Sequence, residues 1–394
     1  MFFLAFLLAA VLLLGGCAGP MDIIQSESGS YAASLGSQGT EGKAQKTYDD
    51  AFCEKVPRYA YETLSDAQKL WYEDMEHILG SMESDGPLSK EGFAEGLSDP
   101  DIELIFQCVC IDHPEFFFVD GFSYVTHYLD EEIIGYDFSG HYSMDRREAA
   151  KKLLEIQEER QNVIVGWGTT ASDQRDYGKV KYVYEYLIRN VEYDMEAPDN
   201  QNIYSALVRK RSVCQGYSKA VQYLLNGMGV ECTLVQGEAF GQTHGWNLVK
   251  ADDAYYYLDV TWGDNSYHPG GDDASPEILY DYFLVTTEEI LKEHVITEIV
   301  PLPVCMSAAD NYFVQENAYL LGADEEQLKS LFANATPENG WQVSLKCADE
   351  TCFRDVKELL LGKNKIFDYY PGSNNKVAYY QNEELFCLTF WVTN

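Results

Sequence analysis

The chain has 394 residues, of which 46% are hydrophobic and 23% are charged. This length and balance are typical of a globular protein with two or three domains. The 64 acidic and 28 basic residues give a formal net charge of -36. Because a field of that sign repels phosphate backbones, we expect no nucleic-acid partner.

The N-terminus has the pattern of an export signal. Residues 2–14 are apolar without interruption, and this run is too short to span a bilayer as a helix, which needs about 20 residues. The following Leu14-Gly15-Gly16-Cys17 resembles the lipobox of bacterial lipoproteins, although no Lys or Arg precedes the apolar run. We therefore predict a signal peptide at 1–16 and a lipid anchor at Cys17. The protein would then be exported and held on the outer face of the bacterial cell membrane. An uncleaved signal followed by an unrelated cysteine is the alternative.

Two regions lie between the predicted signal peptide and the part of the chain that contains the candidate catalytic residues. Residues 17–45 are rich in Gly, Ser, Ala and Gln, which predicts a flexible tether. Residues 46–170 predict a mostly helical region with a small hairpin. Its helices are expected after a capping box at Ser65, over 100–111 and over 145–165, and its strands at 116–119 and 122–129, joined by a turn at 120–121.

The cysteines of the chain do not form a recognisable framework. Ten are present, their spacing is irregular, and disulfides and free buried thiols both remain open. Cys108 and Cys110 precede His113, but no second pair of ligands with matching spacing is visible, so we expect no metal site there.

Residues 171–300 form the region expected to carry the chemistry. Helices are predicted over 180–188, 203–207 and 214–227, and strands over 231–236, 246–250 and 255–260. Residues 301–394 predict a small α+β domain. Its expected elements are a strand at 312–321, a helix at 324–333, a strand at 342–347, a helix at 355–361 and strands within 377–392.

Cys214 has the position expected of a nucleophilic thiol. It opens an amphipathic helix, where unsatisfied backbone N–H groups and the helix dipole stabilise a thiolate. Its own backbone N–H is a natural donor to a developing oxyanion. Gly216 is expected to let a substrate backbone approach closely.

His244 and Asp259 are predicted to meet on a hairpin. His244 begins one strand and Asp259 ends the next, with Asp252-Asp253 between them. A two-residue turn makes His244 and Asp259 diagonal neighbours on one face. The carboxylate could then orient the imidazole and stabilise its charged form.

Three short runs around these residues resemble the motifs of the transglutaminase-like superfamily, in the same order and with similar separations. They are 211–218 (RSVCQGYS), 243–247 (THGWN) and 258–262 (LDVTW). The segments 280–285 and Glu293-His294 also resemble the end of bacterial members of this domain. The resemblance covers about residues 175–295. It implies an α+β, papain-like core, with the cysteine helix packed on an antiparallel sheet that carries His and Asp.

The resemblance implies a cysteine-dependent enzyme with Cys214 as nucleophile, His244 as base and Asp259 as orienter. We predict acyl transfer on protein or peptide amides through a thioester at Cys214. A cysteine peptidase or amide hydrolase with the same triad, and a non-catalytic surface binding protein, are the alternatives. No cofactor or metal is expected.

Several further residues receive predictions. Gln201 is a candidate second oxyanion donor. Tyr217, Trp246 and Trp262 could wall an amine-binding site, although aromatic side chains in such positions are commonly core. The remaining histidines considered lie outside the three motifs and are expected to play no part in the site: His77, His268 and His294.

Overall fold

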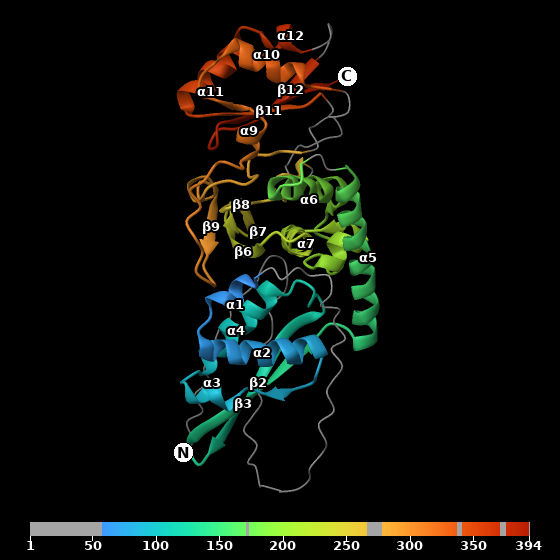
Figure 1. Ribbon diagram of the computed structural model, residues 1–394, viewed down its shortest axis with the longest axis vertical. Coiled ribbons are helices and arrows are strands. Elements are labelled where there is room, and N and C mark those ends of the chain that lie inside the picture. The colour runs from blue at the N-terminus through green and yellow to red at the C-terminus, as the bar shows by residue number, and fades with distance from the viewer. Residues whose placement is uncertain (1–56, 171–172, 266–277, 337–340, 371–375, 394) are drawn as a thin grey trace. The chain divides into compact units, whose positions relative to one another are not determined.

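The computed structural model describes residues 57–170, 173–265, 278–336, 341–370 and 376–393 (Figure 1). The chain forms two compact units, Met1–Glu155 and Ile156–Asn394. The predicted signal peptide, the tether and Cys17 lie outside the described residues. Within the described ranges, no helix is long and apolar enough to cross a membrane.

The first unit combines short helices with a three-stranded sheet. Its helices are α1 (Tyr59–Thr63), α2 (Asp66–Ser81), α3 (Lys90–Ala94) and α4 (Asp99–Asp112), and α5 (Arg146–Thr170) continues into the second unit. Its strands are β1 (Gly86–Pro87), β2 (Val119–Leu129) and β3 (Glu132–Tyr142), in the order β1-β3-β2.

In this unit the predicted capping box is confirmed, but the predicted position of the hairpin is not. Ser65 Oγ accepts the N–H of Gln68 at 3.3 Å and Gln68 Oε1 accepts the N–H of Ser65 at 3.1 Å, so the predicted capping box opens α2. The predicted turn at 120–121 is wrong, because β2 runs through it with a register irregularity between Val119 and Gly121. The chain turns at Asp130 instead, which has φ 58°.

The second unit begins with the part that carries the predicted triad. Its helices are α6 (Asp176–Asn190), the π-helical turn η1 (Ser205–Arg209), α7 (Cys214–Gly227) and α8 (Thr287–Ile290). Its strands are the parallel pair β4 (Glu192–Tyr193) and β5 (Arg211–Ser212), then β6 (Cys232–Ala239), β7 (Gln242–Ala251), β8 (Ala254–Leu258) and β9 (His294–Thr297).

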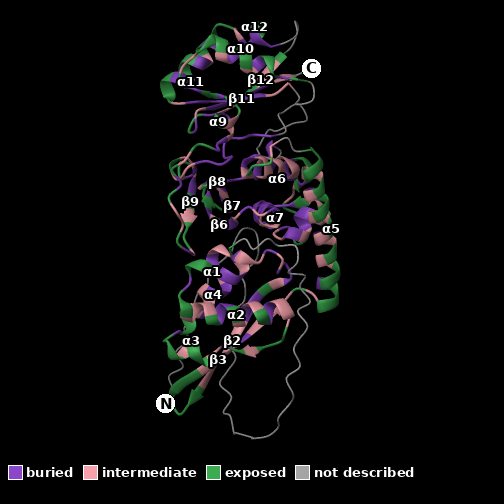
Figure 2. Ribbon diagram, viewed as in Figure 1, coloured by how far each residue is buried: buried purple, intermediate pink, exposed green. Residues whose placement is uncertain are grey.

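The last four of these strands form an antiparallel sheet in the order β8-β7-β6-β9. Helix α7 packs against β7 and β6, and nearly all of its length is buried, whereas much of α5 is exposed (Figure 2). Its buried residues include polar side chains such as Gln215, Ser218 and Gln222 as well as apolar ones such as Val221 and Leu224. The expected α+β class, with the cysteine helix on an antiparallel sheet, is confirmed.

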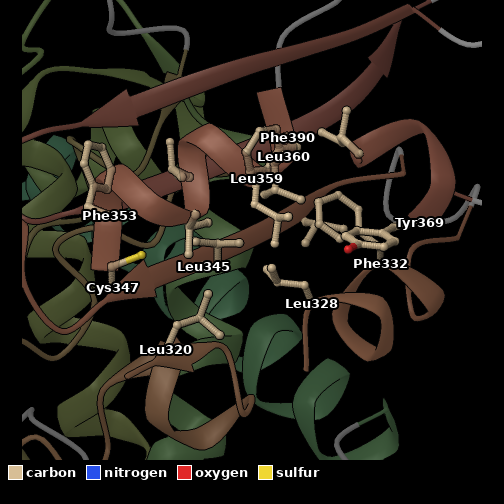
Figure 3. Close-up of a cluster of buried hydrophobic side chains, with 14 of the residues drawn as sticks. Leu320, Leu328, Phe332, Leu345, Cys347, Phe353, Leu359, Leu360, Tyr369 and Phe390 are labelled. Atoms are coloured by element: carbon tan, nitrogen blue, oxygen red, sulfur yellow. The ribbon is translucent and has the colours of Figure 1, made fainter. Parts of the chain in front are cut away.

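The C-terminal part of this unit has its own sheet and core. Its helices are α9 (Tyr312–Gln315), α10 (Glu325–Ala333), α11 (Glu350–Lys357), η4 (Glu358–Gly362) and α12 (Ile366–Tyr369). The strands β10 (Tyr319–Leu320), β11 (Val343–Cys347), β12 (Lys376–Asn382) and β13 (Cys387–Thr393) pair in the order β10-β11-β13-β12. Side chains such as Phe332, Leu345 and Phe390 meet in a buried apolar cluster (Figure 3).

Two expectations for this part need correction. The strand predicted at 312–321 is the short helix α9 followed by β10, because the Asn311 side chain caps the Phe313 N–H at 3.1 Å and Asn317 turns the chain at φ 55°. The helix predicted at 355–361 starts earlier, at Glu350, and continues through η4. The helix at 325–333 and the strand at 343–347 agree with the prediction.

Candidate active site

Cys214 is the first residue of α7, and the preceding Val213 is extended. The first N–H groups of a helix have no partner within it, so the thiol lies at the positive end of the helix dipole. Cys214 is buried, with 6% of its surface exposed. The position predicted from the sequence is therefore the position it occupies.

Two polar side chains connect the cysteine helix to the histidine strand. Ser218 Oγ lies 2.8 Å from the Cys214 carbonyl oxygen and 2.7 Å from that of Gly245, so its single proton can serve either one. Asn247 Nδ2 donates to the Ser218 carbonyl oxygen at 2.9 Å. These buried bonds fix α7 against β7 and thereby set the thiol relative to the imidazole.

The hairpin that carries His244 and Asp259 has the predicted register. Ala251 pairs with Ala254 across the two-residue turn, and Asn247 pairs with Leu258. The resulting diagonal brings His244 Nε2 to 2.7 Å from Asp259 Oδ2. Asp259 Oδ1 also accepts the backbone N–H of Trp262 at 3.1 Å.

The charges of the site are strongly coupled. Burial lowers the pKa of His244, but the charge and hydrogen bond of Asp259, together with a hydrogen bond to the Cys214 side chain, raise that pKa to about 10. Burial raises the pKa of Asp259, because it disfavours the charged carboxylate. The imidazoles of His244 and His294 outweigh the effect of burial and hold this pKa well below its usual range. Since Nε2 of His244 is bonded to Asp259, Nδ1 is left for the thiol. The arrangement can hold a proton on the imidazole beside the sulfur.

His294 also lies in the site, against the expectation for it. Its Nε2 is 3.0 Å from Asp259 Oδ2, the same oxygen that His244 contacts. Composition and spacing around His294 do not indicate this, because β9 comes 35 residues after Asp259 and reaches it only through sheet pairing. The resemblance of Glu293-His294 to the end of the domain is the signal in the sequence that could have found it.

Gly216 does not have the role predicted for it. A Cβ on Gly216 would lie 1.9 Å from Ser212 Oγ and 2.9 Å from the Asn200 carbonyl oxygen. The missing side chain therefore lets the start of α7 pack on its own protein, and not on a substrate.

The aromatic side chains near the motifs are mostly core. Tyr217 and Trp246 are fully buried and Trp262 almost so, and they do not line an open wall. The exposed aromatic side chain is Phe240, at 72%, whose ring stacks on Trp262 with centroids 4.7 Å apart. Phe240 has φ 50°, an unusual conformation for a bulky residue, in the turn between β6 and β7.

Among the described residues, one cluster could hold a metal ion by distance alone, namely His244, Asp259 and His294. A tetrahedral zinc with bonds of about 2.0–2.1 Å would separate its ligand atoms by about 3.3 Å. The nitrogen–oxygen distances here are 2.7 and 3.0 Å, which are ordinary N–H···O hydrogen bonds. Hydrogen bonds between the imidazoles and the carboxylate therefore explain these distances better than a tetrahedral zinc ion does.

Four other buried cysteines of the described residues are free thiols, namely Cys108, Cys232, Cys305 and Cys387. Burial raises the pKa of Cys108 to about 12 and that of Cys305 to about 11, and it raises the pKa values of Cys232 and Cys387 well above the usual range. These thiols are poor nucleophiles near neutral pH.

His113, which follows Cys108 and Cys110 in the sequence, lies between two carboxylates. Its Nδ1 is 2.9 Å from Glu115, and its other nitrogen is 3.2 Å from Glu76.

Comparison with known proteins agrees with the architecture. Residues 166–267 match the family model of the transglutaminase-like superfamily. Comparison with curated protein sequences gives no match. The α+β core expected from the sequence is thus shown, and its residues 166–267 are similar to a superfamily whose members are cysteine-dependent enzymes.

Three solved structures are similar to this chain at low identity. One is described as a TGase, with 14% identity, a TM-score of 0.27, and coverage of 39% of this chain and 52% of that chain. A proposed cysteine protease from Cytophaga hutchinsonii has 13% identity, a TM-score of 0.26, and coverage of 45% and 58%. The periplasmic domain of TgpA from Pseudomonas aeruginosa, bound to ethylmercury, has 15% identity, a TM-score of 0.21, and coverage of 33% and 58%. The chain thus matches a little over half the length of each.

Proposed function

We propose that the protein is a cysteine-dependent acyltransferase that acts on protein or peptide amides through Cys214. The observation that carries the proposal is the placement of His244. Its imidazole is bonded to the thiol side chain and, 2.7 Å away on the other side, to the buried carboxylate of Asp259. A nucleophile, a proton carrier and an orienting acid in contact are what thiol acyl transfer requires.

The reaction follows from these contacts. The Cys214 thiolate adds to the amide carbonyl carbon, and the oxyanion that forms can accept the backbone N–H at the start of α7. The C–N bond then breaks as His244 gives its proton to the leaving nitrogen, which departs as ammonia or an amine. An acceptor amine attacks the thioester, His244 takes the acceptor's proton, and the C–S bond breaks to restore the thiolate.

The burial of the site favours an amine over water as the acceptor. Cys214 has 6% of its surface exposed, His244 4% and Asp259 none. A site that limits water protects a thioester from hydrolysis. The net charge of -36 would also gather lysine side chains near the protein.

The test supplies glutamine-containing peptides with and without a labelled primary amine. We expect amine incorporation by the wild type, none by Cys214→Ala, and unchanged incorporation by Cys305→Ala, which removes a buried thiol elsewhere. Peptide cleavage without incorporation at saturating amine would make the protein a peptidase. A folded protein that shows neither reaction, and whose Cys214 no thiol-reactive acyl probe labels, would be a binding protein.

We also propose that the protein is exported and anchored through Cys17. The proposal is supported by the 13-residue apolar run and the Gly15-Gly16-Cys17 sequence that follows it. Two or more acyl chains on one cysteine suffice for stable membrane attachment. The mature N-terminus should map to Cys17, and Cys17→Ala should remain unprocessed; a mature N-terminus elsewhere would contradict the proposal.

A further inference from the structure

His294 reaches the site from the far edge of the sheet. It begins β9, where it pairs with Ala239 of β6, whereas Asp259 follows β8 at the opposite edge. Gly237 of β6 makes the crossing possible, because a Cβ there would lie 1.9 Å from the Val295 carbonyl oxygen and 2.8 Å from the Trp246 ring. The absent side chain lets β9 and Trp246 approach β6 closely.

The ring of His294 is enclosed by aromatic side chains. Its centroid lies 4.9 Å from Trp246, 4.7 Å from Trp262 and 4.9 Å from Tyr282. The residue is 1% exposed, and its Nδ1 has no hydrogen-bond partner among the described residues. A buried nitrogen without a partner costs free energy, and an apolar side chain would fill this box without that cost. The bond from Nε2 to Asp259 is the feature that an apolar side chain could not supply.

That bond completes the support of the Asp259 carboxylate. One oxygen accepts the Trp262 N–H at 3.1 Å, and the other accepts His244 at 2.7 Å and His294 at 3.0 Å. Without His294, the oxygen that faces His244 would keep His244 alone as a donor. The carboxylate could then rotate together with the imidazole it is meant to orient.

We propose that His294 is a positioning residue of this site, which bonds the same oxygen of Asp259 as His244 does and so holds the carboxylate that orients His244. The proposal rests on the function proposed above. It assigns a fourth side chain, from an element outside the three sequence motifs, to the same hydrogen-bond network. His294 does not touch the thiol or the substrate in this scheme and acts only through Asp259.

Three variants separate positioning from packing. His294→Gln keeps an N–H donor near the position of Nε2, and His294→Leu fills the box without a donor. Tyr282→Phe is the matched control, because it alters the same aromatic box by removing only the hydroxyl that bonds Glu293. Each variant is measured for kcat and KM in amine incorporation and for its thermal unfolding temperature.

We expect His294→Leu to lower kcat by roughly 10- to 100-fold, by analogy with the loss of the hydrogen-bond partners that orient metal ligands, with KM changed less than about threefold. His294→Gln should recover most of kcat, and Tyr282→Phe should match the wild type. A folded His294→Leu protein with wild-type kcat would overturn the proposal. So would equal losses in the Gln and Leu variants, or a loss that added zinc restores, which would indicate a metal site.

A second measurement keeps this proposal separate from the proposed function. The imidazole N–H of His244 that is bonded to Asp259 should give a far-downfield proton resonance in the wild type and in His294→Gln. We expect it to broaden or shift in His294→Leu. If no substrate turns over, this resonance still tests positioning, and an unchanged resonance in His294→Leu would overturn it.

Discussion

Replacing Asp259 with Asn tests what keeps His244 protonated. Burial alone would lower the pKa of this histidine, and Asp259 is the foremost of the groups that raise it from 6.5 to about 10. A difference of about 3.5 pH units corresponds to on the order of 5 kcal/mol in favour of the charged imidazole. Asn keeps the size of the side chain without its charge. Burial would then dominate, and the pKa of His244 should fall to about 6.5 or lower.

The loss of positive charge on His244 should be largest between pH 6.5 and pH 10. At pH 8 a group with a pKa of about 10 is roughly 99% protonated, and one with a pKa of about 6.5 is roughly 3% protonated, so the cationic fraction falls about 30-fold. Because the folded-state pKa is raised, the stabilisation from the charged imidazole is complete below pH 6.5 and is lost as pH rises through 10. Asp259→Asn should therefore remove most of the decline in stability over that range.

The assay follows the imidazole resonances of 15N-histidine-labelled protein from pH 5 to 10.5, beside amine incorporation at each pH. Asp252→Asn is the matched control, since it makes the same chemical change at the exposed turn of the same hairpin. It should leave the His244 midpoint near 10. If His244 titrated at the same pH in Asp259→Asn and in the wild type, or if the control moved the midpoint as far, Asp259 would not be the group that raises this pKa.

Three further substitutions test stability. His113 lies between Glu76 and Glu115, and although burial lowers its pKa, the two carboxylates raise that pKa to about 10. His113→Gln should therefore lower the free energy of unfolding by about 3 kcal/mol near pH 6 and by little near pH 10; equal losses at both pH values in urea denaturation would contradict this. Phe332→Ala in the C-terminal core should lower the free energy of unfolding by about 3–5 kcal/mol, which would be measured as faster hydrogen exchange in β11. A loss below about 1 kcal/mol would show that the core is loosely packed. Gly237→Ala should cost about 2 kcal/mol or more, because its Cβ would collide with the Val295 carbonyl oxygen, and wild-type stability in urea would show that β9 can move away.

The sequence was sufficient where the structural cause is local. The capping box at Ser65, the start of α7 at Cys214 and the two-residue turn before Ala254 each depend on a few adjacent residues. Since the side chains of a strand alternate, the register of one turn was enough to bring His244 to Asp259. The candidate triad could be predicted for this reason.

Where the cause is distant, the sequence was not sufficient. His294 enters the site through pairing between β6 and β9, and no periodicity near residue 294 encodes that contact. Gly121 has the appearance of a turn residue, but it sits in a strand irregularity whose partner, His141, is twenty residues away. In both cases pairing with a strand far away in the sequence decided the outcome.

In this chain the end of the sequence similarity and the end of the folded sheet lie at different residues. The match to the superfamily ends at residue 267, whereas the sheet is completed only by the strand that ends at Thr297. A polypeptide cut at 267 would contain Cys214, His244 and Asp259 but would leave residues 236–239 of β6 without the strand that pairs with them. Such an open edge recruits strands from other molecules. We therefore expect a fragment cut at the limit of sequence similarity to self-associate more readily than one that extends through Thr297, which keeps β6 paired on both sides.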